Sequence, residues 1–184
     1  MNLEALLDAV APADDKEAGD LRELRSAARA LPSPFSRHQQ PAHFTGSAVV
    51  VTPDGEQVCL VLHAKLQRWL QPGGHANPED EGDLCATALR EAREETGCRV
   101  ALHPRAPRPL DVDVHVIPAR KDEPAHRHLD VRFLVVAEDP EALAFDPRES
   151  HGAQWLSWDD ALARADEAPL RRLLRKSRAL LAAP

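Results

Sequence analysis

Three glutamates at helical spacing, Glu91, Glu94 and Glu95, are the residues of this chain best suited to chemistry. On a helix that turns by about 100° per residue, they share a stripe roughly 100° wide beside a face of small apolar residues. Carboxylates this close repel one another unless protons, basic side chains or metal ions compensate their charge. Hard divalent cations such as Mg²⁺ prefer oxygen ligands, so the stripe predicts a metal site.

The same spacing is also typical of a solvated helix, on which Arg90 and Glu94 would form an ordinary surface ion pair. The neighbouring sequence favours the metal site. Pro72-Gly73-Gly74 predicts a glycine turn before the helix, and the helix ends in the run REAREETG at residues 90–97. Together these segments resemble the Nudix box, G-x5-E-x7-R-E-U-x-E-E-x-G-U, and they match its second half in full when alanine and cysteine are accepted at the two apolar places.

The first half of the box is two residues longer here than in the family pattern. Counting forward from the second glycine places Asp80 where the family has its first glutamate, whereas counting back from Arg90 places Gly82 there. Glu79 and Glu81 flank Asp80, so all three acids are candidates for that place.

The resemblance implies an α/β fold, a Nudix-like α/β/α sandwich with a mixed sheet, and hydrolysis of a diphosphate linkage with Mg²⁺ or Mn²⁺ as cofactor. By this resemblance Glu91, Glu94 and Glu95 are the metal-binding glutamates, with Glu91 and Glu95 as direct ligands. Arg90 corresponds to the arginine that orients a glutamate. The Gly73-Gly74 turn would supply backbone flexibility and amide donors near the substrate phosphates.

One further acid outside the box is a candidate for the same site. Glu149 precedes a predicted strand at 153–156 in the manner of the family's late loop, so the resemblance makes it a candidate metal ligand or base. A solvated loop acid is the other interpretation. Asp139, Glu141 and Asp146 are weaker competitors for this role.

Alternating polar residues on a predicted strand share one face of a sheet, and three do so here: His126, His128 and Asp130. Such a trio would suit a transition metal or a phosphate of the substrate. The other interpretation is a polar beginning of the strand, from which Arg132 points outward. His75, beside the glycines, and His115 are further candidates for the substrate site.

The composition narrows the class of protein. A chain of 184 residues suffices for one domain with appended helices, and its net charge of -7 argues against binding to nucleic acid. There is no apolar stretch of the ~20 residues that a membrane span needs and no secretion signal at the N-terminus. Three cysteines without a C-x-x-C pair indicate a reducing compartment. We therefore expect a cytoplasmic protein without a membrane partner.

The elements that must position these residues follow from the hydrophobic pattern. Residues 2–31 carry leucines at helical spacing and predict a helical arm of one long or two short helices, packed against the main domain or against a second subunit in a homodimer. Residues 46–52 and 57–63 predict a hairpin of strands buried on both faces. We divide the chain into an N-terminal helical extension, 1–40, and a Nudix-like domain, 41–184, that includes the C-terminal helices.

After the box, the pattern predicts strands and a helix in this order: strands at 99–102, 111–119, 129–138 and 153–156, and a helix at 159–166. From Pro169 onward, leucines mark one face of a C-terminal amphipathic helix. Its basic residues would also suit an anionic membrane or RNA surface, but docking of the leucine face onto the domain is the favoured interpretation.

The sequence therefore predicts a metal-dependent hydrolase that cleaves a diphosphate linkage in a small molecule, commonly a nucleoside diphosphate derivative. The altered first half of the box supports one alternative, a Nudix-like nucleotide-binding or regulatory module without turnover. An isomerase on the same fold is less favoured because no dedicated acid–base pair is evident. The sequence leaves open which diphosphate is the substrate.

Overall fold

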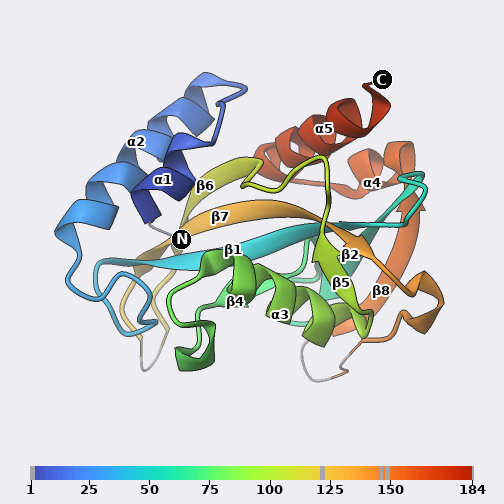
Figure 1. Cartoon of the computed structure of the whole chain (residues 1–184). Coiled ribbons are helices and arrows are strands. Elements are labelled where there is room, and N and C mark those ends of the chain that lie inside the picture. Colours follow the sequence, from blue (N-terminus) through green and yellow to red (C-terminus); the bar gives the residue numbers. More distant parts are fainter. Residues whose placement is uncertain (1–2, 121–122, 146, 148–149, 184) are drawn as a thin grey trace.

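An eight-stranded mixed sheet forms the centre of the computed structural model, in which residues 3–120, 123–145, 147 and 150–183 are described. Helices cover both faces of this sheet (Figure 1). The predicted α/β/α sandwich with a mixed sheet, N-terminal helices and a C-terminal helix is therefore confirmed.

Two long parallel strands lie side by side in the middle of the sheet: β1 (Ala42–Val51) and β7 (His126–Ala137). Their register places His43 opposite His128 and Thr45 opposite Asp130. The remaining strands extend the sheet in antiparallel pairings: β2 (Gln57–His63), β3 (Arg68–Leu70), β4 (Gly73–His75), β5 (Val100–Leu102), β6 (Asp111–Ile117) and β8 (Ser150–Ser157). β2 and β4 pair with β1, β5 and β6 with β7, and β3 and β8 with β2.

The helices are arranged around this sheet in the order α1 (Leu3–Asp8), α2 (Asp15–Ala30), α3 (Leu84–Thr96), α4 (Trp158–Arg164) and α5 (Ala168–Ala182). Two short 3₁₀ turns are η1 (Pro78–Asp80) and η2 (Pro140–Ala142). The predicted N-terminal arm thus consists of two helices. The second is capped by Asp14, whose carboxylate accepts a hydrogen bond from the backbone N–H of Glu17 at 2.8 Å.

Strand β1 is buried along its whole length because both of its faces are covered. Phe44, Ala48 and Val50 contribute to one core with α1, α2 and α3, whereas Val49 and Val51 contribute to a second core with α4 and α5. A strand covered on both faces reads as a nearly continuous apolar run, which is the pattern that the sequence carries.

Helix α5 docks through its leucine face, as predicted. Leu170, Leu173 and Leu174 are at most 2% exposed. Arg172 is also buried, and its Nε and Nη2 atoms donate to the carboxylate of Asp111 at 2.8 and 2.9 Å. A basic residue that suggested a membrane or RNA surface is thus used inside the fold.

Ion pairs that include buried charges connect helices α2 and α5 to strands β6 and β7. Arg132 is 4% exposed and donates through Nε to Asp130 at 2.8 Å and through Nη2 to Asp113 at 3.2 Å. The interpretation in which Arg132 points outward is therefore wrong. Residues 128, 130 and 132 of one strand share a face, so Arg132 points to the same side as Asp130.

Three strands begin earlier than predicted: β1 at Ala42, β7 at His126 and β8 at Ser150. The added residues are mostly polar, so hydrophobic alternation does not reveal them. The predicted glycine turn is also wrong. Gly73 and Gly74 lie in strand β4, where they pair with Ser47 and Gly46 of β1.

The N-terminal helices contribute Leu7 and Leu24 to the core that also contains Phe44. The division of the chain into an extension, 1–40, and a domain, 41–184, stays a prediction. Among the described helices, none is both long and apolar enough to cross a membrane.

Candidate functional site

A groove of about 560 Å³ lies where helix α3 meets strands β1, β4 and β7. Its lining includes the three predicted metal-binding glutamates, both glycines of β4, and the side chains of His75, His128 and Asp130. The fold thus brings together, in one groove, residues from the box and residues of β7 that lie more than thirty positions further along the chain.

Local sequence explains why α3 presents its glutamates to this groove. Asp83 caps the helix by accepting a hydrogen bond from the N–H of Cys85 at 2.9 Å, and Gly97 ends it in the left-handed conformation at φ 69°. Ala88 and Ala92 are fully buried against the sheet, which fixes the rotation of the helix. The adjacent stripe of carboxylates therefore faces the groove.

Arg90 holds two of these carboxylates in place. Its Nη1 atom donates to Oε1 of Glu91 at 2.8 Å and to Oε2 of Glu94 at 3.1 Å. Its Nη2 atom donates to the backbone carbonyl of His75 at 2.7 Å, so the same side chain ties α3 to strand β4.

Asp80, the acid that counting forward from Gly74 puts at the place of the first glutamate, pairs with Arg90. Its two carboxylate oxygens accept from Nε and Nη2 of Arg90 at 3.1 and 3.0 Å, and Oδ2 also accepts from Oγ1 of Thr87 at 3.0 Å and from the N–H of Asn77 at 2.9 Å. Burial by itself would raise the pKa of Asp80, but these hydrogen bonds outweigh it and hold the pKa below its ordinary value.

The longer loop explains how an aspartate, one methylene shorter than glutamate, reaches the arginine. Pro78–Asp80 forms the turn η1, and Glu81 follows it in the left-handed conformation at φ 50°. Asp80 is 5% exposed, whereas Glu79 and Glu81 are exposed. Of the three candidate acids, Asp80 is therefore the one directed inward.

The two glycines are needed because side chains of α3 and β1 lie directly against their backbone. A Cβ atom on Gly74 would lie 2.5–2.7 Å from the carboxylate atoms of Glu91, and one on Gly73 would overlap Ser47. The N–H of Gly73 donates to Oε1 of Glu95 at 3.1 Å. This amide therefore positions a carboxylate of the box.

Histidines from four strands form a cluster next to the glycines. The ring of His128 has its centroid 4.8–5.3 Å from the centroids of His43, His75, His115 and His126. Burial, followed by the charge of Arg37, lowers the pKa of His75 to about 4, and burial together with the neighbouring imidazoles lowers the pKa of His128 to about 2. Both rings are neutral at pH 7.

Sequence reasoning placed His126, His128 and Asp130 on one face, which the register of β7 bears out. It missed His43, whose alternation with Thr45 and Ser47 was a usable signal. The carboxylate of Asp130 does not hydrogen-bond to a histidine among the described residues. It accepts hydrogen bonds from Thr45 and Ser47, each at 2.9 Å, and from Arg132.

The candidates from the late loop do not join this site within the described residues. Glu149 and Asp146 lie outside the described part of the chain. Asp139 accepts a hydrogen bond from the N–H of Arg99 at 2.7 Å, and Glu141 is exposed in η2.

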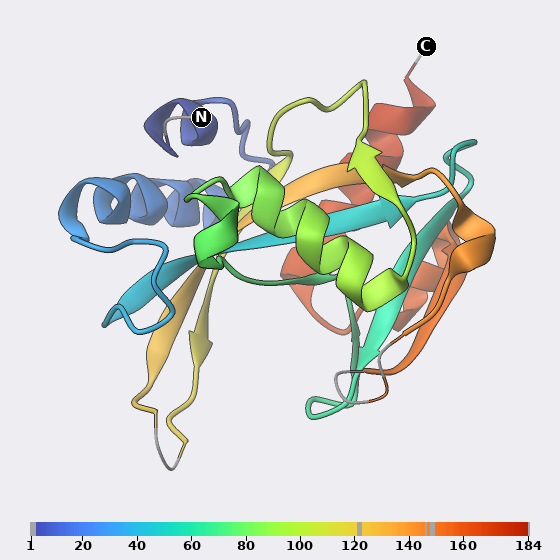
Figure 2. The same cartoon turned by 60° about the horizontal axis from the view of Figure 1, so that its bottom comes forward.

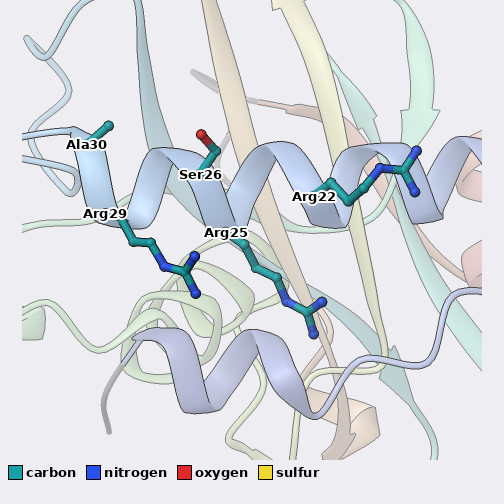
Figure 3. A pocket seen from close by; sticks show the side chains of 5 residues that line it. All are labelled: Arg22, Arg25, Ser26, Arg29 and Ala30. Carbon is teal, nitrogen blue, oxygen red and sulfur yellow. The ribbon is translucent and has the colours of Figure 1, made fainter.

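A second depression lies on α2 and is lined by Arg22, Arg25 and Arg29 (Figure 3). Arg25 pairs with Asp8 at 2.9 Å, and Arg29 pairs with Glu4 at 2.6 Å. These ion pairs join α2 to α1. The rest of its described lining is Ser26 and Ala30, and this lining holds no histidine or carboxylate that could activate the serine hydroxyl, so the groove beside α3 is the candidate active site.

The donor atoms of the groove fit the cofactor that the sequence implied. The stripe presents three carboxylates, and the Arg90 guanidinium is shared among two of them and Asp80. Carboxylate oxygens are the ligands that Mg²⁺ and Mn²⁺ prefer. Glu91, Glu94 and Glu95 are therefore the residues that could hold such an ion.

The fold and this groove define a Nudix-type α/β protein. Comparison with known families agrees, since the sequence model of the NUDIX domain matches residues 42–176. The chain belongs to the NUDIX family. No protein with a curated description matches it in sequence.

Solved structures with the same fold include proteins that act on or bind nucleotides. An Ap4A hydrolase of C. elegans, in a binary complex, is 22% identical over 76% of this chain and 97% of that chain, with a TM-score of 0.60. A NUDIX family hydrolase from Clostridium perfringens is 25% identical, over 76% and 95% of the two chains, with a TM-score of 0.52. The NUDIX domain of Shewanella oneidensis NrtR, complexed with ADP ribose, is 19% identical, over 87% and 99%, with a TM-score of 0.53.

Proposed function

We propose that this protein is a Mg²⁺- or Mn²⁺-dependent hydrolase that cleaves a diphosphate linkage in a nucleoside diphosphate derivative or a related compound. The observation that supports this most directly is the wall of carboxylates in the groove. Glu91 lies against Gly74, Glu95 accepts from the N–H of Gly73, and Arg90 orients Glu91 and Glu94.

In this proposal Glu91 and Glu95 are the direct metal ligands and Glu94 completes the set. The ion, when bound, would neutralise charge on the diphosphate oxygens while water attacks one phosphorus. Arg90 acts as a positioning residue, because its hydrogen bonds go to protein groups. Asp80 fixes the plane of the Arg90 guanidinium and thereby the carboxylates.

Substrate recognition would come from the opposite side of the groove. Lys65 and Arg37 line it and supply positive charge for phosphates in a chain whose net charge is -7. His75, His128 and Asp130 also line it and are proposed to contact the substrate. Glu149 is proposed as a further acid of the site on the basis of its sequence position alone.

The alternative of a binding module without turnover depended on the altered first acid of the box. The Asp80–Arg90 pair favours the hydrolase over this alternative, since it gives the arginine an acidic partner. The related structures suggest substrates to test, because one of them is an Ap4A hydrolase and another binds ADP ribose.

The decisive experiment measures released products over a panel of nucleotide sugars, ADP-ribose, Ap4A, other dinucleotides and modified dNTPs, each with Mg²⁺, Mn²⁺ or a chelator. We expect metal-dependent cleavage of at least one compound. Glu95→Gln and Glu91→Gln should lower that rate by about 100-fold or more, whereas Glu56→Gln, which changes an exposed turn acid, should not. Glu149→Gln tests the remaining candidate acid.

If wild type and Glu95→Gln are equally inert across the panel while a nucleotide still binds, the binding module replaces the hydrolase. The expected cytoplasmic location, the absence of nucleic-acid and membrane partners, and a homodimer stay predictions.

A further inference from the structure

The cluster of histidines lies apart from the glutamate stripe that the proposed hydrolysis uses to hold its metal ion. It lies at the end of the sheet where β1 and β7 begin and β6 ends. These segments lie side by side in Figure 2. The register places His43 of β1 opposite His128 of β7, and His128 opposite His115 of β6. His75 of β4 lies opposite Thr45, two residues from His43, so it is a diagonal neighbour of that ring.

Three of these rings have the spacing of metal ligands. One ring nitrogen from each of His43, His75 and His128 lies within 4.8 Å of the other two. The Nε2 atoms of His75 and His128 are 3.2 Å apart. Tetrahedral Zn²⁺ with Zn–N bonds of about 2.0–2.1 Å separates its ligand nitrogens by roughly 3.3–3.4 Å. Small ring rotations would therefore suffice to surround an ion.

His43 supplies an independent observation that points to a ligand. Its ring is fully buried, and its Nε2 atom has no hydrogen-bond partner among the residues that the structure describes. Its Nδ1 atom lies 3.3 Å from the backbone carbonyl of Gln39, a contact in which Nδ1–H donates and leaves the lone pair on Nε2. A buried polar atom without a partner costs about 1–3 kcal/mol, a cost that a bound cation would remove.

We propose that His43, His75 and His128 bind a divalent transition-metal ion of the Zn²⁺ class, at a site separate from the glutamate stripe. Neutral imidazole nitrogen suits Zn²⁺ and its first-row neighbours, whereas carboxylate oxygen suits Mg²⁺ and Mn²⁺. The two donor sets in this groove thus select different ions.

The surroundings of the three rings favour a preformed site. Each ring is carried by a strand of one sheet, and the backbone of His75 is held by its hydrogen bond to Arg90. His126 packs against His43 with ring centroids 4.9 Å apart and has its own Nδ1 directed to the carbonyl of Pro124 at 3.0 Å. The positive charge of Arg37 near His75 disfavours a bound cation, whereas the negative charge of Glu123 near the same ring favours a bound cation.

The accessible side of the site faces the groove. His75 and His128 line the groove, whereas His43 is buried behind them. An ion held by three histidines would therefore keep its fourth position toward the groove, open to water or to an anionic ligand. Zinc sites with three protein ligands and one exchangeable ligand have this arrangement.

Titration of the tag-free, chelator-treated chain with ZnCl₂ in a large excess of Mg²⁺, followed by calorimetry, tests this proposal. Co²⁺ in place of Zn²⁺ gives an absorption spectrum that reports tetrahedral nitrogen ligation. We expect one ion per chain. His128→Gln and His75→Gln should each weaken binding by at least about tenfold, since loss of a mere supporting partner already costs 10–100-fold.

His115→Gln is the matched control, because it changes a ring that touches His128 but lies outside the ligand set. It should bind Zn²⁺ as the wild type does, and so should Glu95→Gln. His43→Gln changes a fully buried residue, so the fold of this variant is checked by circular dichroism. If His43→Gln does not fold, the Zn²⁺ affinity of His75→Gln, at a half-buried position, tests the proposal.

The proposal is overturned if no Zn²⁺ binds under these conditions, or if binding is lost in Glu95→Gln and kept in His128→Gln. In either case the contact between His75 and His128 is a hydrogen bond between two neutral rings. Hydrolysis is measured separately with Mg²⁺ alone, so failure here leaves the proposed function untouched.

Discussion

The carboxylate of Asp80 accepts two hydrogen bonds from the guanidinium of Arg90, at 3.1 and 3.0 Å, across a loop of the box that is two residues longer than the family pattern. Arg90 in turn holds Glu91, Glu94 and the backbone of His75. Through Arg90, a single buried acid therefore helps to orient two of the three glutamates of the stripe.

Asp80→Asn should lower both stability and activity. Asparagine keeps the shape but removes the charge that Arg90 requires, so we expect a loss of about 1–3 kcal/mol in the free energy of unfolding, measured in urea. Activity should fall because Arg90, which orients Glu91, loses the carboxylate that holds its guanidinium. Glu79→Gln changes an exposed acid one position away and should stay within about 0.5 kcal/mol of wild type. Equal stability of the two variants would contradict the role of Asp80.

Gly74→Ala should reduce activity more than stability. The new methyl group would meet the Glu91 carboxylate at 2.5–2.7 Å and displace it. A misplacement of about 1 Å can cost about 100-fold in rate, so a loss of 10- to 100-fold is expected in steady-state kinetics. Gly152→Ala is the control, because a Cβ atom there meets nothing within 4 Å. Full activity of Gly74→Ala would show that activity does not depend on the position of the Glu91 carboxylate against Gly74.

Asp113 should contribute to the fall in stability at acidic pH. Burial by itself would raise the pKa of Asp113, but the hydrogen bond from His115 and the charges of Arg132 and Lys16 outweigh it and hold the pKa far below 3.8. The unfolded chain then binds the proton more readily than the folded chain. The stabilisation is thus fully present above pH 3.8 and is lost as the pH falls toward the folded pKa.

Urea unfolding of wild type and Asp113→Asn between pH 7 and pH 3 measures this contribution. Below about pH 4 the wild type should lose up to about 1.4 kcal/mol per pH unit more than the variant. Parallel curves for the two proteins would show that the charge of Asp113 has no stabilising partner.

Arg132→Met should destabilise the fold without touching the glutamates. It removes the guanidinium that Asp111, Asp113 and Asp130 share, and leaving buried charge unpaired costs about 3–5 kcal/mol. For a chain of this size each kcal/mol corresponds to about 2–4 °C in Tm, which calorimetry resolves. Arg99→Met removes an exposed arginine and should change Tm little. A Tm of Arg132→Met close to that of the wild type would mean that other groups neutralise the negative charge of the three aspartates.

The sequence by itself determined the local part of the site. Spacing along one helix fixes which side chains share a stripe, so Glu91, Glu94 and Glu95 and the closing Gly97 could be predicted from residue order alone. The hairpin of β1 and β2 and the leucine face of α5 could also be predicted from the sequence. The signals for them, hydrophobic periodicity and turn residues, lie within a few neighbouring positions.

Only the tertiary structure decided how distant segments meet. Which of three adjacent acids turns inward to Arg90 depends on the η1 turn and on the contacts of Thr87 with the loop. The glycines lie in a strand and not in a turn because their backbone pairs with Ser47 and Gly46 of β1.

The histidine cluster depends on the register between strands far apart in the sequence. His43 and His128 are 85 residues apart and become neighbours only because β1 and β7 pair in parallel with that alignment. A shift of one residue in either strand would turn the rings to opposite faces, and no pattern within one segment encodes that alignment.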